Sequence, residues 1–119
     1  MYNQRPIATN NLAPTAQAVT KSGTFTSQEV DLRQIAQDGI FSLEYTFTGS
    51  GVLTWTYTVC STEDGTYFTP SGAADIATST TTGTDGVSFE PELFPFMKIV
   101  ATETGTNTAS ITGLYLNIQ

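Results

Sequence analysis

Apolar and polar residues alternate along two neighbouring stretches near the middle of the chain, residues 40–48 and 52–60. A strict period of two is typical of a β-strand that lays one face on a core and the other toward solvent. The Gly-rich segment 49–51 separates the two stretches and predicts a turn, so we expect them to form a hairpin. The apolar positions are Phe41, Leu43, Tyr45 and Phe47 in the first stretch, and Leu53, Trp55, Tyr57 and Val59 in the second.

Shorter strand patterns occupy most of the remaining chain. They cover residues 24–32, 74–80, 96–104 and 109–118, and a threonine- and glycine-rich segment at 81–86 predicts a loop. About seven or eight short strands separated by turns are typical of an all-β fold, an antiparallel β-sandwich or jelly-roll. The last two strands are expected to turn Met97, Ile99, Ala101, Leu114, Leu116 and Ile118 toward the core.

Two prolines shape the segment at residues 87–96. Pro91 and Pro95 cannot donate ladder hydrogen bonds, so this segment cannot be one central strand. We expect a short strand followed by a crossover that carries Phe89, Leu93 and Phe94 onto the core.

The first 22 residues differ from the rest of the chain. They are polar and alanine-rich, show no sustained period, and contain Pro6 and Pro14, which favour extended conformations before them. We interpret residues 1–22 as an extended N-terminal arm and residues 23–119 as the β-sandwich domain. The arm is either a loose terminus or a segment that docks on a neighbouring subunit. In the docked case its contact residues are Tyr2, Arg5, Ile7 and Leu12.

Charge excludes two classes of partner. The chain has 4 Lys and Arg against 11 Asp and Glu, a formal net charge of -7, and its cations are scattered. Binding to nucleic acid or to an anionic membrane requires clustered cations, so neither partner is expected. No apolar run of membrane-spanning length and no signal peptide are recognised. A single cysteine, Cys60, allows no internal disulfide, which suits assembly in a reducing cytoplasm.

Candidate chemistry is sparse. The sequence has no histidine, so it lacks the residue most used for acid–base catalysis near neutral pH and cannot activate Cys60 through an imidazole. Asp85, Glu90 and Glu92 are interpreted as solvated charges rather than a catalytic pair. We therefore expect no enzyme activity, no cofactor, no metal and no small-molecule substrate.

The stretch Ser61–Phe68, STEDGTYF, is interpreted as a chain reversal. Asp64 and Gly65 both tolerate the positive φ of a type I′ turn, which would place Ser61 opposite Phe68. In this register the Phe68 side chain joins the apolar face beside Val59. The alternative is a carboxylate site for a metal or a sugar, although Ca²⁺ binds about six to eight oxygens and this stretch supplies few.

Two sequence elements of residues 23–119 form a recognisable combination. The first is a strand followed by S-x-x-D-G-x-x-F, here Ser61, Asp64, Gly65 and Phe68. The second is a Pro-Phe approach to a KIVAT strand, followed by a short hydrophobic final strand; its residues are Phe94, Pro95, Lys98, Ile99 and Val100. With these elements, residues 23–119 resemble small β-sandwich virion proteins of tailed bacteriophages.

This resemblance implies a capsid decoration, or cement, protein. Such proteins are typically trimers whose arms clamp neighbouring capsid subunits, so the implied partners are the major capsid protein and further copies of this chain. The implied location is the surface of the virion head, after assembly in the host cytoplasm. The alternative is a glycan- or receptor-binding β-sandwich module of a phage head fibre or tail.

Overall fold

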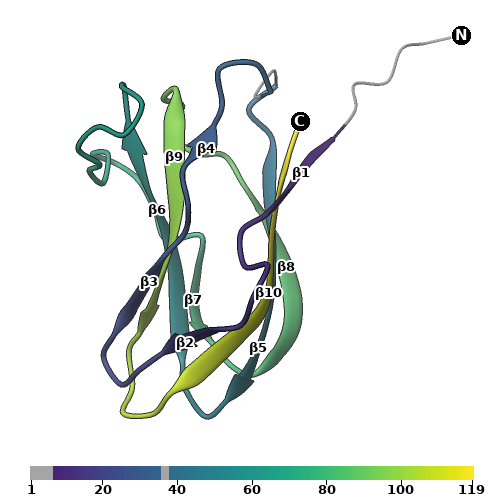
Figure 1. The fold of residues 1–119 in the computed structure, drawn as a ribbon, viewed down its shortest axis with the longest axis vertical. Coiled ribbons are helices and arrows are strands. Elements are labelled where there is room, and N and C mark those ends of the chain that lie inside the picture. Colours follow the sequence, from purple (N-terminus) through teal and green to yellow (C-terminus); the bar gives the residue numbers. More distant parts are fainter. Residues whose placement is uncertain (1–6, 36–37) are drawn as a thin grey trace, which may run out of the picture.

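The computed structural model describes residues 7–35 and 38–119, which form two antiparallel β-sheets packed face to face (Figure 1). The all-β sandwich is confirmed, with ten strands over these residues rather than seven or eight. One sheet, sheet A, contains β1 (Ala8–Asn11), β2 (Gln17–Val19), β5 (Phe41–Gly49), β8 (Gly83–Phe89) and β10 (Ala109–Ile118). The other, sheet B, contains β3 (Thr24–Thr26), β4 (Val30–Asp31), β6 (Leu53–Cys60), β7 (Ala77–Thr80) and β9 (Phe96–Glu103). None of the described residues forms a helix long and apolar enough to span a membrane.

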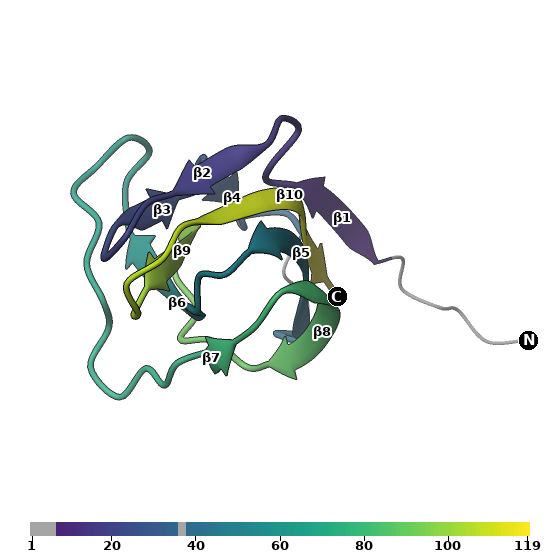
Figure 2. The same ribbon diagram turned by 90° about the horizontal axis from the view of Figure 1, so that it is seen from below.

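The strands follow one another in the order β1-β10-β5-β8 in sheet A and β3-β9-β6-β7 in sheet B. Strand β2 also pairs with β10, and β4 with β9. Figure 2 looks along the strands and shows β7 and β8 next to each other at one edge of the sandwich. The chain therefore passes from one sheet to the other between these two edge strands.

The predicted hairpin of the two alternating stretches is wrong. β5 pairs with β10 and β8, whereas β6 pairs with β9 and β7, so the turn at residues 49–51 crosses between sheets. Gly49 has a φ of 98°, and a Cβ there would lie 2.5 Å from the carbonyl oxygen of Thr108. A period of two identifies the buried face of each strand but not the partner strand, which explains the error.

The alternation itself is confirmed, and it builds the core. The two apolar faces meet across the sandwich, where the ring of Tyr45 stacks on Trp55 at 4.9 Å between centroids. The Trp55 indole donates to the Thr80 hydroxyl (3.1 Å), which donates in turn to the carbonyl of Leu53 (2.9 Å). All the residues expected to face the core from the last two strands are buried: Met97, Ile99, Ala101, Leu114, Leu116 and Ile118.

Much of the segment interpreted as an arm belongs to the sandwich. β1 and β2 both pair with β10 of the same chain, so the boundary drawn at residue 22 does not fall at an edge of the fold. Leu12 donates its N–H to the Leu114 carbonyl (2.8 Å), and its side chain, 3% exposed, lies in the core. Leu12 is thus occupied within its own chain, whereas Ile7 is exposed. Tyr2 and Arg5 lie outside the described residues.

Two other strand expectations need correction. Residues 24–32 form two short strands, β3 and β4, and not one. The strand is interrupted at Ser27, where the side-chain hydroxyl, instead of a backbone carbonyl, accepts the N–H of Ile99 (2.9 Å). The segment 81–86, expected to be a loop, contributes to β8, which pairs with β5 from Gly83 to Phe89. β8 ends before Pro91, as the proline predicts.

A buried carboxylate ties together the turns at the end of the sandwich opposite the start of β5. Glu103 accepts backbone N–H groups from Val52 (2.8 Å), Gly105 (3.0 Å) and Ser22 (3.3 Å). These hydrogen bonds, that from Val52 foremost, hold the pKa of the Glu103 carboxyl below its usual value. The ionised form is therefore the one that the fold stabilises.

We expect this carboxylate to make the fold sensitive to acid. Since the folded-state pKa lies below the unfolded one, its contribution is complete above the usual glutamate pKa and is lost as the pH falls through the lowered value. Glu103→Gln should lower the urea midpoint at neutral pH and reduce the loss of stability on acidification. The control is Glu44→Gln, an exposed glutamate, which should leave both unchanged. Equal pH profiles for Glu103→Gln and the wild type would contradict this role.

Candidate functional site

The stretch Ser61–Phe68 reverses the chain, but with a longer loop than predicted. Phe68 pairs with Val59 through reciprocal N–H···O bonds of 2.9 and 3.0 Å, and not with Ser61. Asp64 alone takes the positive φ, 56°, so the turn is not the two-residue type I′ loop that the Asp-Gly pair predicts. Phe68 lies beside Val59 as expected, yet its side chain is 46% exposed.

Contacts from the rest of the fold hold this loop in place. The Glu29 carboxylate accepts the N–H of Asp64 (3.0 Å) and the hydroxyl of Tyr67. Burial, followed by this bond to Glu29, raises the pKa of the Tyr67 hydroxyl, which stays protonated as a donor. The ammonium of Lys98 lies 4.4 Å from the centre of the Tyr67 ring. Glu29 thus has a structural role, because its carboxylate holds this loop against the rest of the fold.

Exposed apolar residues gather at the end of the sandwich at which β6 finishes and β9 begins. We call it the apolar end and define it by Ile7, Ile40, Phe68, Leu93 and Phe94. The first four are 46–60% exposed, and Phe94 packs against the core. Leu93 was expected to lie on the core but faces solvent at 53% exposure, because the crossover turns it outward.

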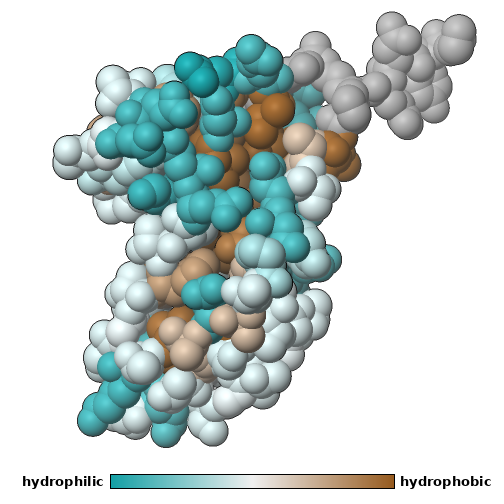
Figure 3. All heavy atoms as spheres, viewed as in Figure 1, coloured by the Kyte–Doolittle hydropathy of each residue, from teal (hydrophilic) through white to brown (hydrophobic). Residues whose placement is uncertain are grey.

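These residues form two groups at the same end of the sandwich. The ring of Phe68 meets that of Phe94 edge-on at 5.4 Å, and Leu93 follows along the chain. A Cβ added at Gly39 would lie 3.4 Å from Leu93, so the backbone just before Ile40 passes close to Leu93. Ile7 and Ile40 line one small hollow of about 90 Å³. Figure 3 shows hydrophobic surface in this upper part of the molecule, between hydrophilic residues, and a second group of hydrophobic atoms in the lower half of the same face.

The apolar end has a charged border and a shallow depression. A hollow of about 290 Å³ is lined by Leu32, Arg33, Leu93, Phe94 and Pro95. The Arg33 guanidinium lies 5.0 Å from the centre of the Phe96 ring and binds Asp31 at 2.8 Å. The hydrogen bond from Arg33 lowers the pKa of the Asp31 carboxyl. An apolar centre with a polar border is the usual composition of a protein-binding surface.

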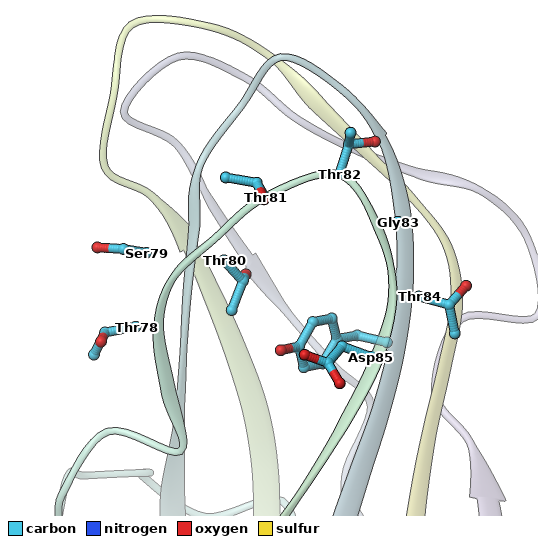
Figure 4. Close-up of a pocket in the computed structure, with 9 residues that line it drawn as sticks. Thr78, Ser79, Thr80, Thr81, Thr82, Gly83, Thr84 and Asp85 are labelled. Atoms are coloured by element: carbon cyan, nitrogen blue, oxygen red, sulfur yellow. The ribbon is translucent and has the colours of Figure 1, made fainter.

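A second hollow, polar and about 330 Å³ in volume, lies between the edge strands β7 and β8 (Figure 4). We call it the hydroxyl-lined hollow. Asp85 and Thr80 point into the space between the two strands, whereas Thr84 points to the other side of β8. Thr84 meets the hydroxyl of Thr46 there at 2.8 Å. The lining residues are Tyr45, Thr78, Ser79, Thr80, Thr81, Thr82, Gly83, Thr84 and Asp85.

The carboxylates singled out in the sequence do not gather. Asp85 lies in the hydroxyl-lined hollow, while Glu92 donates its backbone N–H to the Tyr57 hydroxyl (2.8 Å) in the crossover after β8. Within residues 7–35 and 38–119, no three carboxylate or thiol side chains come together as metal ligands. Cys60 is buried, with its sulfur 3.1 Å from the Thr62 carbonyl oxygen.

No protein family matches this sequence, and no curated protein is similar to it. Among solved structures, it is similar to chitosan-binding module 1 derived from a chitosanase/glucanase of Paenibacillus sp. IK-5. The TM-score is 0.50 at 12% identity, over 93% of this chain and 92% of that one. The chain is a β-sandwich module. At this identity the likeness establishes the fold alone.

Two further matches are weaker. A chain in the structure of infectious bursal disease virus, Gx strain, has a TM-score of 0.48 at 15% identity, over 96% of this module and 32% of that chain. TmCBM61, solved in complex with β-1,4-galactotriose, has a TM-score of 0.43 at 12% identity, over 96% of the module and 89% of that chain.

Proposed function

We propose that this chain is a structural virion protein, a decoration protein that binds the outside of a tailed-phage head and clamps neighbouring capsid subunits. One observation carries the proposal: the two sequence elements that carry the resemblance contact each other in the fold. Phe68 belongs to the first element and Phe94 to the second, and their rings contact each other at 5.4 Å on the apolar end. Residues that carry the resemblance thus contribute to an exposed apolar surface as well as to the core.

The composition of that surface supports a protein partner. Contiguous exposed apolar residues are unusual on a monomer and mark interaction sites, because leaving them in water is unfavourable. The apolar end would meet the major capsid protein, with Arg33 and Lys98 at its border aligning the two surfaces. A net charge of -7 keeps the rest of the module soluble and repels nucleic acid.

The proposal includes the assembly and its location. The module would act as a homotrimer at the head surface, assembled in the host cytoplasm, so that several modest contacts hold each copy in place. Native mass spectrometry of the purified chain tests the trimer, and a monomer would contradict it. Electron cryo-microscopy of the parent particle tests the location. Density for the module on the tail, or a head surface without such density, would contradict the decoration role.

We expect the apolar end to be required for binding to the shell. Phe68→Ser and Leu93→Ser each remove an exposed apolar anchor, so each should weaken co-sedimentation with shells of the major capsid protein about 10- to 100-fold. The matched control is Thr106→Ala, an exposed residue at the opposite end of the sandwich, which should bind as the wild type does. Unchanged affinity in both serine variants, with circular dichroism confirming an intact fold, would exclude this surface.

A further inference from the structure

We propose that the hydroxyl-lined hollow is a carbohydrate-binding site for a neutral or amino sugar, whose hydroxyls bond to the Tyr45 hydroxyl and the Asp85 carboxylate. The site lies between β7 and β8, away from the apolar end, so this proposal goes beyond the clamping role and does not depend on it. It rests on a donor and an acceptor that the fold holds in place and leaves without a protein partner across the hollow.

Tyr45 supplies a rigid donor. Its ring is 3% exposed and stacks on Trp55, so the core fixes its position. Its hydroxyl makes no hydrogen bond within the described residues, where every fully buried side-chain nitrogen or oxygen has a partner. The hydroxyl is therefore open to the hollow that Tyr45 lines. A donor fixed in advance loses little entropy when a ligand binds.

Asp85 supplies the acceptor. It lies directly opposite Tyr45 in the β5–β8 ladder and points into the hollow (Figure 4). One of its carboxylate oxygens accepts the N–H of Gly86 (2.8 Å), which leaves the carboxylate with further acceptor capacity. Burial and the charge of Asp85 raise the pKa of the Tyr45 hydroxyl, so this group stays a donor. A hydroxyl donor beside a carboxylate acceptor suits a sugar diol, which both accepts and donates hydrogen bonds.

The rest of the lining decides the ligand class. Thr78 and Ser79 also line the hollow, although their side chains point away from the space between β7 and β8 (Figure 4), and Thr80 is already engaged by Trp55 and Leu53. None of the lining residues is a cation, so Asp85 disfavours uronic or sialic acids and tolerates an amine. A volume of about 330 Å³ is at the small end of ligand sites, which span roughly 300–1,000 Å³. The hollow therefore suits one or two sugar rings, bound weakly through hydrogen bonds.

The test is a titration of the ¹⁵N-labelled full chain with D-glucose, D-glucosamine or D-glucuronate, followed by NMR. Glucose and glucosamine should shift the amides of residues 78–86 at millimolar concentrations, and glucuronate should not. Tyr45→Phe keeps the ring and removes one hydrogen bond, whereas Asp85→Asn removes the charge of the acceptor. Each variant should bind the sugar about tenfold more weakly. The matched controls are Tyr115→Phe on β10 and Glu44→Gln on β5, which should bind as the wild type does.

Three results would overturn the proposal. The first is that none of the three sugars shifts amides of residues 78–86. The second is that Asp85→Asn and Tyr45→Phe both retain wild-type affinity. The third is that glucuronate binds most tightly, which would contradict the part assigned to Asp85. Asp85 is at the surface and its replacement leaves the core intact, so the test stands even where Tyr45→Phe loses stability.

Discussion

Replacing Trp55 with alanine is expected to lower the free energy of unfolding by about 3–5 kcal/mol, the usual cost of emptying an aromatic site in a core. Trp55 is fully buried, stacks on Tyr45, and contacts Phe47 at 6.4 Å between ring centres. It also binds Thr80, which ties β6 to the edge strand β7. Because domains of this size are stable by roughly 5–15 kcal/mol, the variant would be close to unfolding.

Urea denaturation, followed by circular dichroism, measures this loss. Tryptophan fluorescence cannot follow the unfolding of the variant, because Trp55 is the single tryptophan of the chain. Trp55→Phe should cost less, because it keeps most of the ring packing and loses the bond to Thr80. The exposed Phe68→Ala is the control and should cost well under half as much as Trp55→Ala. A loss below about 1 kcal/mol for Trp55→Ala would contradict a core built on these two facing strands.

Leu12→Ala is expected to cost about 2–5 kcal/mol, as buried leucines do. The expectation follows from the structure and opposes the interpretation of residues 1–22 as a separate arm. Leu12 lies in the core beneath sheet A, and its N–H is held by Leu114. A residue of a free arm would contribute nothing to the stability of the isolated chain.

The matched control is Ile7→Ala in the same segment. Ile7 is 60% exposed, so its truncation should change the free energy of unfolding by no more than about 0.5 kcal/mol. Both variants are compared with the wild type by urea denaturation at a low protein concentration, at which few copies of the chain associate. Equal stabilities of the Leu12→Ala and Ile7→Ala variants would restore the arm interpretation.

The sequence allowed the core to be predicted better than the connections. Alternation placed Tyr45 and Trp55 inside correctly because side chains leave a strand on opposite faces in turn. It could not tell that their strands belong to different sheets, since a Gly-rich turn serves a hairpin and a crossing equally well. Leu12 was missed because one apolar residue in a polar segment shows no period, and only its pairing with β10 buries it.

The candidate surfaces were harder to predict still. The apolar end brings together residues from before β1, before β5, after β6 and after β8, so no local pattern could identify it. Phe68 and Phe94 stood in the sequence resemblance, but their contact is a tertiary one. In the hollow, Asp85 was interpreted as a solvated loop charge because its segment is rich in threonine and glycine. Its position opposite Tyr45 follows only from the register of β8.

The central position of β10 has a consequence for synthesis on the ribosome. β10 joins β1, β2 and β5, whose residues are translated long before residues 109–118. A nascent chain lacking those residues holds these three strands without their common partner, so sheet A cannot close until translation has passed them. Sheet A therefore closes only after residues 109–118 have left the ribosome, and it folds slowly because its contacts join residues that are distant in the sequence. During that delay the edges of β1 and β5 are open to aggregation, a hazard that the acidic charge of the chain reduces.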